Sequence, residues 1–123
     1  MTKEEITDII FDGFGACGCG DPVSTIQLLI NILKVLDLSN WNNVKSLTMR
    51  GQRKLNEQQN EQFTNIVGGD RYSTIGQIVL YTLDRAKLIE HGGTICLSWL
   101  TPLGKEFLSY FETNTIESIF KND

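Results

Sequence analysis

The chain has 123 residues, 41% of them hydrophobic, which is enough for one hydrophobic core and too little for two. The most apolar stretch, residues 23–38, is interrupted by Gln27, Asn31, Lys34 and Asp37, which argues against a membrane span. The net charge is −4, which argues against binding to nucleic acid through overall charge.

The charged residues are unevenly distributed along the chain. Residues 1–43 hold two bases and six acids, residues 44–87 seven bases and four acids, and residues 88–123 two bases and five acids. The middle third could therefore face an anion, although an ordinary solvated surface explains the same pattern. The N-terminal sequence MTKEEITDII has acids where a signal peptide needs bases, so we expect a cytoplasmic protein with reduced thiols.

Hydrophobic periodicity predicts a mainly α domain with one β-hairpin. Helices are expected near residues 3–13, 22–37, 44–66, 74–87 and 102–113, with a short terminal helix near 115–120. The helix over 22–37 is apolar around most of its circumference, so it should form the buried centre of the core. The helix over 44–66 has only a thin apolar stripe and should be the most exposed.

Several helix starts are marked by capping residues. Thr2 with Glu5 has the spacing of a capping box, and so does Thr74 with Gln77. The pairs Asp21–Pro22 and Thr101–Pro102 each join an N-cap residue to a proline at the first helical position. These signals predict where four of the helices begin.

The region after residue 73 predicts a helix, a hairpin and a second helix. In the first of these helices an apolar stripe should face the core, and it consists of Ile75, Ile78, Val79, Leu83 and Ala86. The segments KLIE and TICLSWL are strand-like and flank a turn with the sequence HGG. Alternation along the second strand would allow Cys96 to face the core.

The segment LIEHGG…WLTPLGKEFL resembles the wing and the following helix of winged-helix regulators of the MarR and PadR type. In those proteins a strand, a turn and a strand lead into a helix that starts Leu-Thr-x-x-Gly-x-x-x-Leu. The length predicts one domain, 1–123, with a helical part over residues 1–62, and the resemblance makes residues 63–123 its winged-helix-like part. The resemblance covers about the last 50 residues of the chain.

Taken over the whole chain, the sequence is similar to short proteins of phages and prophages of Gram-positive bacteria in two segments. One is the segment Cys-Gly-Cys-Gly-x-Pro, and the other is the tail EHGG…WLT..GKEFL. This similarity implies a phage origin and the host cytoplasm as the compartment. It implies no activity.

Two cysteines stand in a glycine-rich loop, and they raise the question of a metal site. Cys17, Cys19, His91 and Cys96 together would offer zinc three sulfurs and one imidazole. The alternative is a structural glycine turn, in which the two small loop cysteines pack against the helix over 22–37. We predict the structural turn and no obligatory cofactor, with zinc as the alternative.

The sequence gives little support for an enzymatic function. Cys17 and Cys19 precede a helix, which lowers a thiol pKa, but Asp21 at the cap opposes that effect. His91 has no acidic or amide partner at a recognisable spacing. The loop GACGCGDP lacks the Lys-Ser/Thr ending of a phosphate-binding loop. We therefore expect no enzyme.

DNA binding is one reading of the winged-helix resemblance, because the helix before the wing would enter the major groove. The outward face of that helix would comprise Arg71, Thr74, Gln77, Tyr81, Asp84 and Arg85. Gln77 and Arg85 are competent base readers, while Arg53 and Lys54 could hold phosphate. The wing tip EHGGT, however, contains no Arg or Lys.

Protein binding is the reading that we place first. A winged-helix layout on an acidic chain keeps a shape that binds partners but lacks the cations that DNA requires. We predict a non-enzymatic phage-type protein that inhibits or modulates a host protein, with a homodimer possible and no membrane association. The predicted contact residues are Arg50, Arg53, Lys54, Arg71, Gln77, Tyr81 and Arg85. A DNA-binding transcriptional regulator and a small zinc-binding protein are the alternatives.

Overall fold

The computed structural model describes residues 1–13 and 22–121 of the chain. Within these residues the protein is mainly helical with one two-stranded antiparallel hairpin, which confirms the predicted fold class. The helices are α1 (Lys3–Asp8), α2 (Pro22–Leu36), α3 (Trp41–Val44), α4 (Met49–Val67), α5 (Thr74–Arg85) and α6 (Pro102–Thr113). Shorter turns are η1 (Ile9–Gly13), η2 (Asp37–Ser39), η3 (Ile95–Leu97) and η4 (Ile116–Phe120), and the strands are β1 (Ile89–His91) and β2 (Ser98–Leu100).

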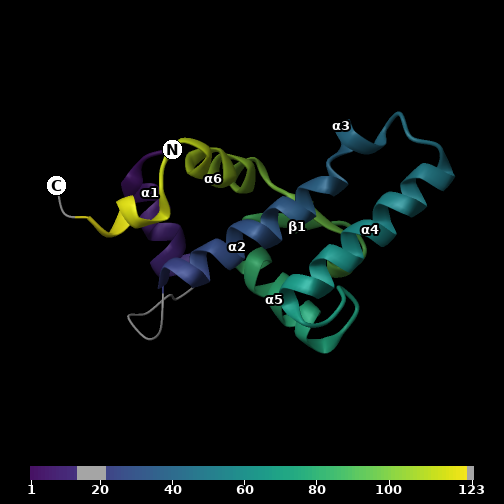
Figure 1. The fold of residues 1–123 in the computed structure, drawn as a ribbon, viewed down its shortest axis with the longest axis horizontal. Coiled ribbons are helices and arrows are strands. Elements are labelled where there is room, and N and C mark those ends of the chain that lie inside the picture. Colours follow the sequence, from purple (N-terminus) through teal and green to yellow (C-terminus); the bar gives the residue numbers. More distant parts are fainter. Residues whose placement is uncertain (14–21, 122–123) are drawn as a thin grey trace.

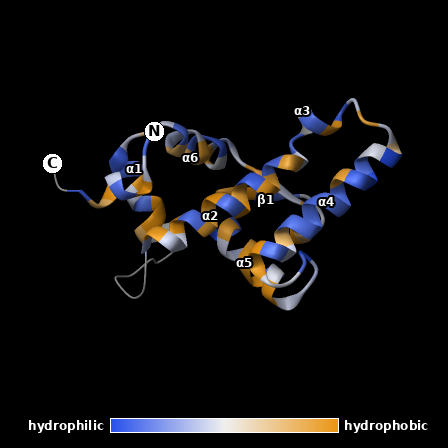
Figure 2. Ribbon diagram, viewed as in Figure 1, coloured by the Kyte–Doolittle hydropathy of each residue, from blue (hydrophilic) through white to orange (hydrophobic). Residues whose placement is uncertain are grey.

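Helix α2 is the centre of the core, as its composition predicts. It runs through the middle of the molecule and packs against α4, α6, β2 and η4 (Figure 1). Figure 2 shows hydrophobic residues gathered on α2 and α5, whereas α4 is mostly hydrophilic. The segment Pro22–Ser39 is long and apolar enough to cross a membrane, but seven side chains of α2 are buried in the core of this domain.

Two of the predicted helix starts are confirmed by their hydrogen bonds. The Thr2 hydroxyl accepts from the backbone N–H of Glu5, whose side chain accepts from the Thr2 backbone N–H, so the capping box is present. Thr101 caps α6 by accepting from Gly104 N–H, and Pro102 is the first helical residue. Pro22 begins α2 as expected, while the predicted cap Asp21 lies outside the described residues.

Helix α5 begins and ends differently from the prediction. Ser73, rather than Thr74, is its N-cap and accepts from Gly76 N–H at 3.0 Å, so the predicted capping box is wrong. The helix ends at Arg85, because Lys87 adopts a left-handed conformation with φ 65°. Leu88 N–H donates to Leu83 O and Lys87 N–H to Asp84 O, which is a Schellman ending.

The helix predicted over residues 44–66 begins five residues later than expected. A short α3 is followed by a break, and α4 starts at Met49 with Thr48 as its cap. The Thr48 hydroxyl accepts from Gly51 N–H at 3.1 Å, and this local bond favours a new helix start over a continuous one. Helix α4 ends at Val67, and its C-cap Gly68 has a φ of 88°, a left-handed conformation that glycine adopts without steric cost.

The hairpin pairs Ile89 with Leu100, Glu90 with Trp99 and His91 with Ser98. The connection between the strands is longer than the predicted turn HGG, because η3 occupies Ile95–Leu97 before β2 begins. Cys96 therefore lies in this helical turn rather than in a strand, although it is buried as predicted. Helix α6 packs against β2, and its Gly104 lies close to the backbone oxygen of Leu88, the residue before β1.

Candidate interaction surfaces

Arg71 was expected on the outer face of the helix before the wing, and this expectation is wrong. The residue precedes α5 and is fully buried. Its guanidinium donates to Gln59 Oε1 at 2.7 Å and to Asn56 Oδ1 at 2.6 Å, and its backbone N–H donates to Asn60 Oδ1 at 3.1 Å. Arg71 is therefore a structural link between α4 and the start of α5 rather than a contact residue.

The amide of Gln59 carries this link onward to the core helix. Gln59 is itself buried, and its Nε2 donates to Val35 O at 3.0 Å and to Ser39 Oγ at 2.6 Å. Burial lowers the pKa of Arg71, because desolvation disfavours the charged form, while the nearby Tyr72, Cys96 and Asp70 oppose that effect. The polar network thus fixes α5 relative to both α4 and the end of α2.

Sequence reasoning missed the amide members of this network, although a signal for them exists. Asn56, Gln59, Asn60 and Phe63 recur at the spacing of one helical face. Gln59 and Phe63 are the buried side chains of α4. A stripe of uncharged amides that ends in a phenylalanine indicates a helix face that packs against polar groups of the protein. A face in contact with solvent would carry charged residues instead.

Helix α5 presents an apolar outer face, which reverses part of the predicted core stripe. Ile75 and Ile78 are 51% and 61% exposed, and Tyr72 and Tyr81 are 53% and 55% exposed. Gly76, Leu80 and Leu83 form the buried face instead. Helix α5 therefore has two apolar stripes. The stripe with Leu80 and Leu83 faces the core, and the stripe with Ile75 and Ile78 faces solvent.

The apolar face continues into a groove between α5 and α2. The groove has a volume of about 240 Å³ and is lined almost entirely by apolar side chains. Its walls include Leu28 and Leu29 from α2, and Ile78 and Val79 from α5. Leu28 is 45% exposed, so α2 is not buried on every side as its composition suggested.

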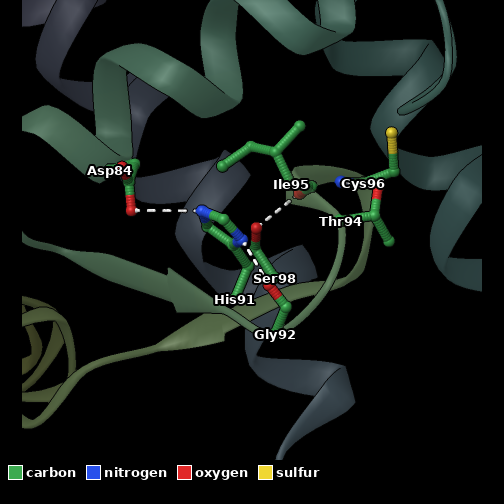
Figure 3. A network of polar contacts seen from close by, with 7 residues as sticks. All are labelled: Asp84, His91, Gly92, Thr94, Ile95, Cys96 and Ser98. Carbon is green, nitrogen blue, oxygen red and sulfur yellow. Dashed lines mark hydrogen bonds and ion pairs between the residues drawn. The ribbon is translucent and has the colours of Figure 1, made fainter.

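The other predicted residues on α5 differ in their availability. Tyr81 and Arg85 are exposed, as predicted for contact residues. Gln77 is half-buried, and its Nε2 donates to Tyr72 O at 3.0 Å, so this amide is engaged within the protein. Asp84 lies 3.9 Å from His91 Nε2, which joins α5 to the hairpin (Figure 3).

The first half of α4 and the loop before it form a projecting segment with four exposed bases. These are Lys45, Arg50, Arg53 and Lys54, and we call this segment the basic arm. It extends away from the rest of the molecule together with α3 (Figure 1). No acidic residue occurs between Asp37 and Glu57, and Met49 in the arm is 81% exposed. The arm therefore concentrates positive charge on an acidic protein.

The residues of the zinc alternative are only partly described. Cys17 and Cys19 lie outside the described residues. Cys96 is buried, and Figure 3 shows its sulfur directed away from His91, whose Nδ1 contacts Gly92 O at 2.9 Å. Among residues 1–13 and 22–121, no three His, Cys, Asp or Glu side chains are grouped as metal ligands.

A larger hollow of about 760 Å³ lies between α2 and the C-terminal end of α6. Lys34 and Asp37 line it from the α2 side, and Glu112 and Glu117 from the opposite side. One carboxylate oxygen of Asp37 is buried without a hydrogen-bond partner. The hollow is lined by polar and apolar side chains in similar measure, and the described residues that line it form no recognisable catalytic constellation.

Comparison of the chain with protein-family models, curated proteins and solved structures finds no match in any of the three. The winged-helix and phage resemblances accordingly stay predictions.

Proposed function

We propose that the chain is a non-enzymatic, phage-type binding protein that acts on a host protein, which it engages through the basic arm. The observation that carries this proposal is the arm itself, with four exposed bases and no acid between Asp37 and Glu57 on a chain of net charge −4. Such a segment attracts a partner with an acidic surface and accelerates their encounter.

The arm offers more than charge. Met49 is 81% exposed and Leu47 is 36% exposed, so apolar side chains stand among the bases. A flexible methionine adapts to irregular apolar surfaces and is common at protein interfaces. A nucleic acid would contact the basic side chains through its phosphates and would leave the exposed Met49 and Leu47 uncovered. The combination favours a protein with an acidic rim and a small apolar centre.

The layout of the remaining predicted contacts also favours protein over DNA. If α5 and the hairpin served as the recognition helix and wing of a winged helix, both would approach the duplex. Helix α5, however, turns Ile75 and Ile78 outward and carries no charged residue from Thr74 to Leu83. The exposed hairpin tip, residues 92–94, contains no base. Phosphate contacts would therefore be few where a winged helix needs them.

The test is capture of the target from nuclease-treated lysate of a Gram-positive host, followed by reconstitution with the purified target. The variant is Arg50→Ala/Arg53→Ala/Lys54→Ala, and the matched control is Lys34→Ala/Lys105→Ala, which removes exposed bases from α2 and α6. We expect the triple variant to lose at least about tenfold in affinity at physiological salt, while the control binds like the wild type.

Two outcomes would overturn the proposal. One is recovery of nucleic acid alone, lost on nuclease treatment, which would favour the DNA-binding regulator. The other is a reconstituted protein complex whose affinity is unchanged by the triple variant, which would move the contact away from the arm.

A further inference from the structure

We propose that the apolar face of α5 binds a second copy of this chain, antiparallel, across a two-fold axis that passes beside Ile78. The face is solvent-exposed: Ile75, Ile78 and Tyr81 of α5, and Tyr72 just before the helix, are each more than half exposed. This inference is independent of the target of the basic arm.

The position of Ile78 defines the axis. At 100° per residue, Ile78 lies at the centre of the exposed face, between the flanking Ile75 and Tyr81. In an antiparallel pair centred there, Ile78 contacts Ile78 of the second copy. Ile75 then faces Thr82 of the other helix, and Tyr81 faces Thr74. Every one of these contacts joins uncharged side chains.

The charges at the two ends of α5 specify the antiparallel orientation. Asp70 precedes the helix and exposed Arg85 ends it, while Asp84 beside Arg85 is directed to His91 of the hairpin rather than to the exposed apolar face. In the antiparallel pair each Arg85 lies over the Asp70 end of the other copy, and the two helix dipoles oppose one another. A parallel pair would bring like charges together at both ends, which is destabilising.

The groove beside α5 supplies the shape that a second copy needs. Its volume of about 240 Å³ lies directly against Ile78, between α5 and Leu28 of α2. By symmetry each helix inserts side chains into the groove of the other, which is the self-complementary contact typical of two-fold dimers. A standard interface buries roughly 800 Å² per partner. That is about a tenth of the total accessible surface of 7558 Å².

The first experiment measures mass in solution by sedimentation velocity across a range of protein concentrations. Wild type should be a concentration-dependent dimer, and Ile78→Glu should be a monomer because two carboxylates would meet at the axis. Met49→Glu is the matched control, since Met49 is 81% exposed at the start of α4, which projects away from the rest of the molecule (Figure 1). It should remain dimeric. A monomeric wild type, or a dimeric Ile78→Glu variant with native circular dichroism, would overturn the proposal.

The second experiment tests the orientation by disulfide cross-linking in a Cys17→Ser/Cys19→Ser background. Ile78→Cys should cross-link rapidly with itself. Tyr81→Cys lies three residues from the axis, so its two copies stand roughly 9 Å apart along the helices, beyond the reach of a disulfide. It should cross-link poorly with itself but well with Thr74→Cys in a mixed sample. Equal self-cross-linking at positions 78 and 81 would indicate a parallel pair and overturn the proposal.

Discussion

Arg71 Nη1 donates to Gln59 Oε1 over 2.7 Å, and both side chains are buried. The bond joins the residue before α5 to the middle of α4, and Gln59 in turn donates to Val35 O at the end of α2. A buried cation is thus held by neutral amide oxygens, which satisfy its donors and offset part of the cost of its desolvation. Three helices take their relative positions from this one polar link.

Arg71→Met should lower the free energy of unfolding by about 2–4 kcal/mol, since it leaves the buried acceptor of Gln59 without a donor and removes the bond to exposed Asn56. The control Arg53→Met removes an exposed base and should change stability by less than about 0.5 kcal/mol. Urea denaturation followed by circular dichroism measures both. Equal midpoints for the two variants would contradict the structural role of Arg71.

Gly104→Ala and Gly51→Ala should have opposite effects. A methyl group at Gly104 would collide with the backbone oxygen of Leu88, so we expect a loss of about 1–3 kcal/mol. At Gly51 the nearest atoms are 3.4 Å away, and alanine should stabilise α4 by up to about 1 kcal/mol. Thermal unfolding gives the sign of each change, and a stabilising Gly104→Ala would refute the close approach.

Lys87→Gly should stabilise the protein by about 0.5–1 kcal/mol, because Lys87 occupies the left-handed position after α5, where glycine carries no steric penalty. The same change at exposed Lys105, inside α6, should destabilise by about 1 kcal/mol. Chemical denaturation of the two variants side by side tests the opposite signs. A destabilising Lys87→Gly would be incompatible with the Schellman ending.

Thr101→Val should cost about 1–2 kcal/mol, since the hydroxyl accepts from Gly104 N–H at 3.0 Å and donates to Lys87 O at 2.7 Å. Thr101→Ser keeps the hydroxyl and should retain most of the stability. The comparison isolates the hydrogen bonds from the methyl group. If serine and valine destabilised equally, packing rather than capping would explain the role of Thr101.

Local signals predicted most of the helix starts, although Ser73 caps α5 in place of the predicted Thr74. The Thr2–Glu5 capping box, Pro22 and the Thr101–Pro102 start all stand where expected, because each depends on bonds within a single turn. The order of helix, hairpin and helix after residue 73 is also confirmed. These features need no knowledge of distant contacts.

Burial was harder to predict, because it depends on what each face meets in space. On α5 the stripe of Ile75 and Ile78 and the stripe of Leu80 and Leu83 are both apolar, and periodicity cannot choose between them. Arg71 looked like a surface base, since the acceptors that bury it lie eleven to fifteen residues earlier, on α4. For the zinc alternative, Cys17 and Cys19 lie outside the described residues.

The division of α4 into a packed end and a projecting end has a consequence for its dynamics. Its buried side chains, Gln59 and Phe63, lie in the second half. The helical turns of the basic arm are therefore held only by their continuation into that packed half. An isolated helix of about ten residues is marginal in water. Amide hydrogens from Arg50 to Leu55 should therefore exchange through local fraying, while those near Phe63 exchange only in larger openings. A bound target would slow exchange in the arm first, so the arm itself reports on occupancy.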